Sequence, residues 1–145
     1  LFKFTRAILS GAPIDVYNHG RMQRDFTYVD DLVDSIARLV EVAPVRPSGP
    51  EAIAAGDSLS PVAPYRVVNI GNATPVPLME FIAAIEAATG QTAQKNMMEM
   101  QPGDVPVTCA DIADLQAAIG FSPATPIEVG LTKFVAWYRD YYQTA

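Results

Sequence analysis

The stretch GRMQRDFTYVDD (residues 20–31) combines a glycine turn, a short strand and the start of a helix. Residues 25–29 are rich in β-branched and aromatic side chains, which predicts a strand. Asp30 and Asp31 follow directly, and acidic side chains at this point supply a cap and favour the positive end of a helix. A strand that leads straight into a helix is typical of an α/β domain.

The same two patterns continue on both sides of this stretch. Apolar residues recur at helical spacing in about five segments, and short apolar runs lie between them. We predict helices over residues 1–10, 30–42, 77–89, 111–120 and 125–142. We predict strands over residues 14–17, 25–29, 65–71 and 95–100. The expected fold class is α/β, with about five helices and short strands in a small sheet.

Residues 43–64 interrupt this pattern. The segment is rich in proline, glycine and serine and shows little periodicity, so we expect an exposed, mobile insertion. The segments on either side of it are too short to bury separate hydrophobic cores. We therefore expect a single domain over residues 1–145.

The composition excludes several kinds of partner. The net charge is -6, with 10 Lys and Arg against 16 Asp and Glu, so we expect no basic surface for nucleic acid or an anionic membrane. The single cysteine, Cys109, cannot form an internal disulfide, and we expect it to be buried. No apolar run approaches the roughly 18 residues that a membrane-spanning helix needs. These features fit a cytoplasmic protein.

Sequence motifs for catalysis are absent. There is no phosphate-binding glycine loop, no dinucleotide fingerprint and no nucleophile elbow. His19 is the only histidine, so a multi-histidine metal site cannot form. We therefore expect no catalytic and no metal-binding residue in this chain. Polar residues on turns remain as candidates for ligand binding.

Arg24 is the first such candidate. A guanidinium near the start of a strand offers paired donors that suit phosphate oxygens, and a nearby aromatic ring could stack on a base. The alternative is a weak surface ion pair of Arg24 with Asp25 or Asp30. The residues alone do not separate these two interpretations.

A second candidate lies in the stretch QPGD (residues 101–104). Pro102 and Gly103 suit the centre of a tight turn, which leaves Asp104 facing outward at its end. The Asp104 carboxylate could accept hydrogen bonds from two neighbouring hydroxyls of a ribose or sugar. The alternative is that Asp104 only caps the turn, which the spacing alone favours.

Several stretches, taken in order, resemble a known family. They are RDFTYVDD (24–31), YRVVNIGN (65–72), PGD (102–104) and WYRDYY (137–142), and together they resemble the extended short-chain dehydrogenase/reductase family of nucleotide-sugar epimerases and dehydratases. The resemblance covers nearly the whole chain. The start of the chain, the proline-rich insertion and MQPGDV (100–105) are most similar to the UDP-glucuronate 4-epimerase group.

The resemblance implies roles for individual residues. It implies that Arg24 contacts a diphosphate, that Phe26 lies beside this contact, that Tyr17 packs on uracil and that Asp104 binds the ribose hydroxyls. Gln101 stands where many relatives have an arginine, so a second phosphate arginine is missing there. Asn69 either touches the nucleotide or has a structural role at a strand end.

The resemblance also implies what this chain lacks. The family's N-terminal Rossmann domain binds NAD and carries the catalytic residues, and these residues have no counterpart here. The chain also opens on a helical pattern without an initiator methionine, so we expect it to be a C-terminal part of a longer, homodimeric enzyme. The implied reaction is C4 epimerisation of UDP-glucuronate to UDP-galacturonate. The alternatives are another nucleotide-sugar epimerase or dehydratase, or a free-standing nucleotide-sugar-binding module.

Overall fold

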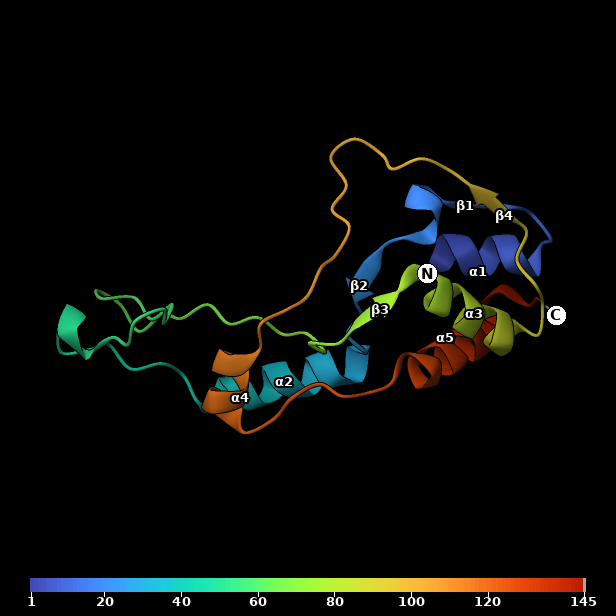
Figure 1. The fold of residues 1–145 in the computed structure, drawn as a ribbon. Coiled ribbons are helices and arrows are strands. Elements are labelled where there is room, and N and C mark those ends of the chain that lie inside the picture. The colour runs from blue at the N-terminus through green and yellow to red at the C-terminus, as the bar shows by residue number, and fades with distance from the viewer. Residues whose placement is uncertain (145) are drawn as a thin grey trace. The chain divides into compact units, whose positions relative to one another are not determined.

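The computed structural model describes residues 1–144 and confirms the predicted α/β class with five α-helices. The helices are α1 (Phe2–Leu9), α2 (Val29–Glu41), α3 (Leu78–Thr89), α4 (Ala113–Ile119) and α5 (Ile127–Tyr142), shown in Figure 1. The strands are β1 (Ile14–Val16), β2 (Gln23–Asp25), β3 (Pro75–Pro77) and β4 (Lys95–Met97). No helix in the described part of the chain has the length and hydrophobicity needed to span a bilayer.

The chain divides into two compact units. The first unit consists of residues 1–26, 74–108 and 125–145, and the second consists of residues 27–73 and 109–124. Each unit is therefore assembled from segments that are far apart in the sequence. The single domain expected over residues 1–145 remains a prediction.

In the first unit, α3 packs against both α1 and α5 (Figure 1). Their apolar faces enclose the hydrophobic core with one face of β1, where Ile14 and Val16 are buried and Asp15 between them is exposed. The other buried members of this core are Ile8, Phe81, Ile82, Ile85, Ala93 and Leu131. The apolar residues whose spacing predicts these helices and this strand are therefore largely the ones that face the core.

The strands form two small sheets in the same unit. β1 pairs with β4 in parallel, with Ile14 opposite Lys95 and Val16 opposite Met97. β2 pairs with β3 in the antiparallel direction. β2 covers residues 23–25 and not the predicted 25–29, because Phe26 leaves the strand to pack on the core and α2 already begins at Val29.

In the second unit, α4 packs against α2. The Arg38 guanidinium lies 4.6 Å from the centre of the Phe121 ring, and the Ala124 amide donates a hydrogen bond to the Asp31 carboxylate. Asp30 and Asp31 lie in the first turn of α2, where their charges favour the helix, and neither is the cap residue, which is Tyr28. Cys109, expected to be buried, is exposed.

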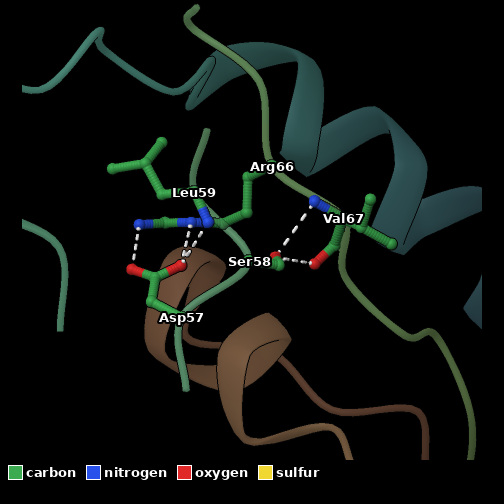
Figure 2. A network of polar contacts seen from close by, with 5 residues as sticks. All are labelled: Asp57, Ser58, Leu59, Arg66 and Val67. Carbon is green, nitrogen blue, oxygen red and sulfur yellow. Dashed lines mark hydrogen bonds and ion pairs between the residues drawn. The ribbon is translucent and has the colours of Figure 1, made fainter. Parts of the chain in front are cut away.

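The strand predicted over residues 65–71 is wrong. In the described part of the chain this stretch has no ladder partner, and a strand needs one to satisfy its backbone groups. Ser58 and Ser60, in the loop that precedes this stretch, bond some of its backbone groups instead. The Val67 amide donates to the Ser58 hydroxyl, and the Ser58 hydroxyl donates to the Val67 carbonyl (Figure 2). The Ser60 amide donates to the Tyr65 carbonyl.

An ion pair closes the same loop. Arg66 donates two hydrogen bonds to the Asp57 carboxylate, from Nε at 3.0 Å and from Nη2 at 2.8 Å (Figure 2). The Leu59 amide also donates to Asp57. Residues 57–67 of the proline-rich region are therefore held together by named contacts, and the mobility expected for residues 43–64 remains a prediction.

Candidate functional site

The pairing of β1 with β4 brings two predicted site segments together in the first unit. β1 leads into the turn Tyr17–Gly20, and β4 leads toward the loop that carries Gln101 and Asp104. Beyond the strands, the Met98 amide donates to the Val16 carbonyl and the His19 amide donates to the Met98 carbonyl, both at 3.0 Å. The turn that carries Tyr17 is thus fixed to the segment that leads to Asp104.

The turn Tyr17–Gly20 has an unusual backbone. Asn18 and His19 both adopt positive φ values, of 50° and 49°, which are uncommon for residues other than glycine. Gly20 has φ 79°, and a Cβ there would lie 2.6 Å from the Met79 sulfur. The positive φ favours glycine at that position, and backbone strain like that of Asn18 and His19 often accompanies a functional site. The Tyr17 side chain is half-buried and makes no hydrogen bond or ring contact with a described residue.

The stretch Gln101–Asp104 forms the predicted tight turn. The Asp104 amide donates to the Gln101 carbonyl at 3.2 Å, and Gly103 has φ 87°, as the third residue of a type II turn requires. Within residues 1–144, neither the Gln101 side chain nor the Asp104 carboxylate forms a hydrogen bond or ion pair. The Asp104 carboxylate is exposed, and it is not engaged in capping the turn.

Arg24 lies in the middle of β2 and is half-buried. Its Nη1 atom donates to the Gln23 carbonyl at 2.8 Å and to the Pro106 carbonyl at 3.3 Å. It forms no ion pair with Asp25 or with any other residue that the structure describes. The surface ion pair considered from the sequence is therefore absent, and the positive charge of Arg24 is not neutralised by a carboxylate.

Phe26 and Asn69 have structural contacts. The ring of Phe26 stacks on that of Phe81, beside the hydrophobic core, so one face of the ring is already covered. Asn69 lies in the second unit, where its side-chain amide donates to the Asp111 carbonyl at 3.2 Å. The structure brings Tyr17, Arg24, Phe26, Gln101 and Asp104 into one compact unit, and Asn69 is the only predicted residue outside it.

One ion pair lies next to the candidate site. His19 Nε2 lies 2.9 Å from Glu99 Oε1, and the hydrogen bond between them lowers the pKa of Glu99 below its usual value. Glu99 is fully exposed, so water weakens this interaction. The pair joins the same two segments as the backbone bonds of Met98.

The arrangement suits the binding of an anion that also carries hydroxyl groups. An arginine without a counter-ion favours phosphate, and a free carboxylate accepts hydrogen bonds from paired hydroxyls. The described residues contain no group of three or more His, Cys, Asp or Glu side chains placed to hold a metal ion. The sequence did not reveal that residues 106–108 pair with β2, since prolines at 106 and 102 gave no strand signal.

The comparisons with known proteins show which class of protein this chain resembles. Residues 1–56 match the NAD dependent epimerase/dehydratase family. Protein CapI of Staphylococcus aureus is 54% identical over 143 residues, which are 99% of this chain and 42% of that protein. The predicted resemblance to the extended short-chain dehydrogenase/reductases is thus confirmed.

The names of two further similar proteins mention UDP-glucuronate or UDP-glucuronic acid. A probable UDP-glucuronate 4-epimerase of Rhizobium meliloti is 50% identical over 145 residues, which are 100% of this chain and 42% of that protein. The solved structure of MoeE5 in complex with UDP-glucuronic acid and NAD is 28% identical with a TM-score of 0.75, and the match covers 97% of this chain and 42% of that chain. The chain spans about two fifths of the length of these relatives.

Proposed function

We propose that this chain binds the uridine diphosphate part of a UDP-sugar. One observation carries this proposal: Arg24 has no counter-ion and Asp104 has no partner within residues 1–144, although both are fixed in the same unit. Arg24 would bind the diphosphate and Asp104 the ribose hydroxyls. Tyr17 would pack on the uracil ring, and Gln101 lies at the start of the Asp104 turn, where it could reach the ligand.

In the longer protein this chain would be the C-terminal, substrate-binding part of a cytoplasmic NAD-dependent UDP-sugar 4-epimerase. The substrate would be UDP-glucuronate and the product UDP-galacturonate, as the name of the Rhizobium meliloti relative suggests. NAD would supply the hydride chemistry from a Rossmann domain outside these residues. The residues of this chain would hold the nucleotide and help to exclude water from the reacting sugar. We expect the full-length enzyme to be a homodimer.

The second unit offers a surface for the remainder of such a protein. Four aliphatic side chains of α2 lie at spacings of four, three and four residues, and each is between 49% and 71% exposed. They are Val29, Val33, Ile36 and Val40. One continuous apolar stripe on a helix is typical of a face that packs against another element. This stripe supports docking of the remaining three fifths of the protein on α2.

Calorimetric titration of the 145-residue chain tests the binding proposal. We expect UDP to bind weakly and NAD not to bind. The variant Asp104→Asn should weaken UDP binding, because a neutral amide is a poorer acceptor for two hydroxyls than a carboxylate. Tight binding of NAD, turnover of UDP-glucuronate by this chain alone, or no binding of UDP would each contradict the proposal.

The substrate is tested separately with the full-length enzyme. Product analysis with UDP-glucuronate and UDP-glucose should show epimerisation of the former. Preferential turnover of UDP-glucose would assign another epimerase of the same family. Upstream sequence is equally decisive, because a strand followed by a glycine-rich loop supports the enzyme and a nearby start codon supports a free-standing binding module.

A further inference from the structure

β2 has backbone partners on both of its sides. On one side it pairs with β3, where Pro77 lies opposite Gln23 and Pro75 lies opposite Asp25. Proline has no amide hydrogen, so these two positions of β3 cannot donate to β2. The backbone groups of Gln23 and Asp25 are instead engaged on the other side of the strand.

Residues 106–108 occupy that other side. The Gln23 amide donates to the Pro106 carbonyl at 2.8 Å, and the Thr108 amide donates to the Gln23 carbonyl at 3.2 Å. The Asp25 amide donates to the Thr108 hydroxyl at 3.4 Å. Gln23 and Val107 form a parallel bridge between the two segments. Residues 106–108 therefore pair with β2 as a short strand would, through one bridge, and are called the added strand below.

Arg24 adds a side-chain contact to this pairing. A single guanidinium nitrogen, Nη1, bonds both the Gln23 carbonyl on its own strand and the Pro106 carbonyl on the added strand. Its Nε and Nη2 atoms make no hydrogen bond to a described residue. One end of the guanidinium thus holds the loop while the rest stays available for a ligand.

Pro106 is only two residues from Asp104, so the backbone between them spans at most about 7 Å. Fixing Pro106 therefore restricts where the Asp104 carboxylate can lie. The turn Gln101–Asp104 is held from its other end by the bond between the Met98 amide and the Val16 carbonyl. The loop that carries Asp104 is attached at both ends, and Arg24 is one of its attachments.

We propose that Arg24 is a positioning residue for Asp104 in addition to its contact with phosphate. The proposal rests on the proposed function of the site. It follows that loss of Arg24 weakens the binding of a nucleoside that has no phosphate at all. The same holds for loss of the Thr108 hydroxyl, which joins residues 106–108 to β2 by accepting the hydrogen bond from the Asp25 amide.

Titration with uridine and UDP, followed by NMR chemical shifts on the 145-residue chain, tests this proposal. Arg24→Ala should weaken uridine binding about three- to tenfold, the effect of one hydrogen bond, and should weaken UDP binding more. Arg46→Ala is the matched control, because Arg46 is exposed in the second unit and its side chain forms no hydrogen bond or ion pair with a described residue. This control should leave uridine binding unchanged. Unchanged uridine binding in Arg24→Ala would overturn the proposal.

A second pair of variants decides the matter if Arg24→Ala does not fold. Thr108→Val removes the hydroxyl and should weaken uridine and UDP to the same extent, whereas Thr108→Ser keeps it and should bind as the original chain does. Faster exchange of the residue 108 amide, which donates to the Gln23 carbonyl, in Arg24→Ala and Thr108→Val would show that the added strand has loosened. Equal uridine binding by Thr108→Val and Thr108→Ser would overturn the proposal. Absence of UDP binding by the unaltered chain would instead refute the proposed function.

Discussion

The ring of Phe26 stacks on the ring of Phe81 with their centroids 4.4 Å apart and their planes 9° apart. Phe26 follows β2 directly, and Phe81 lies on α3 in the hydrophobic core. The contact therefore anchors the strand that carries Arg24 to the most buried helix of the first unit. It also explains how a three-residue strand keeps a defined position.

Phe26→Ala should lower the free energy of unfolding by about 2–4 kcal/mol, because it removes a large ring packed against the core. Urea denaturation followed by circular dichroism measures this loss. Tyr141→Ala is the control, since Tyr141 is an aromatic residue that is 66% exposed. Similar small losses for both variants would show that Phe26 does not anchor the strand.

Gly103→Ala should weaken UDP binding with only a modest loss of stability. Gly103 has φ 87°, a conformation that costs a residue with a side chain about 1–2 kcal/mol, so the turn beside Asp104 would change shape. Gly56→Ala is a matched control, because Gly56 has φ 86° and equally open surroundings in the loop of the second unit. A titration with UDP should show weaker binding for the first variant only. Equal UDP affinities of the two variants would show that the turn Gln101–Asp104 is not part of the UDP site.

The stability of the first unit should fall as the pH drops below about 4. Glu86 accepts hydrogen bonds from Lys95 at 2.5 Å and from the Ala93 amide at 2.8 Å, and the bond from Lys95 is the main reason that the pKa of Glu86 is lowered. A lowered pKa in the folded state means that this stabilisation is present above the unfolded pKa of about 4.3. It is lost as the pH falls through the folded value.

Glu86→Gln isolates this contribution. Urea denaturation at pH 7 should show the variant less stable by about 1 kcal/mol, and the difference should shrink at pH 3. Glu41→Gln is the control, since Glu41 is exposed and forms no ion pair in the described part of the chain. A difference that stays constant with pH would exclude an electrostatic origin.

Asp57→Asn should open the loop of residues 57–67. The variant weakens the two hydrogen bonds that Asp57 accepts from Arg66. The Asp57 side chain is only 20% exposed and the Arg66 side chain 31%. Limited proteolysis should cleave this loop several-fold faster, while the denaturation midpoint changes little. The control is Asp34→Asn, which breaks a comparable pair with Arg38 that is about half exposed. Equal proteolysis rates for the two variants would contradict this prediction.

Local signals in the sequence were sufficient to predict where the helices lie, to within a few residues at their ends. Gly11, Gly90 and Gly120 all adopt the left-handed conformation just after predicted helix ends. Asp111, which its position predicts to cap the helix, accepts a hydrogen bond from the Ala113 amide, but the cap residue of α4 is Ile112. Thr125, Pro126 and Glu128 have the pattern of a capping box, which predicts Pro126 as the first helical residue. Pro126 is instead the cap residue of α5, a shift of one position.

Pairing between distant segments was not predictable in the same way. Residues 65–71 carry the composition of a strand but have no ladder partner among residues 1–144, whereas residues 106–108 act as a strand despite Pro106. Strand pairing depends on neighbours that a local pattern does not contain. The roles proposed for Arg24 and Asp104 came from the resemblance. Only the structure shows that, among residues 1–144, Arg24 has no counter-ion and the Asp104 carboxylate has no hydrogen-bond partner.

The division of the first unit into three separated segments has a consequence for synthesis on the ribosome. β1 and β4 pair across roughly 80 intervening residues, and the core needs Leu131 of α5. Ile8 of α1 therefore stays exposed to solvent until α5, near the end of these 145 residues, has been translated. Such long-range closure slows folding and exposes apolar segments to misassembly, so chaperone dependence during translation is expected.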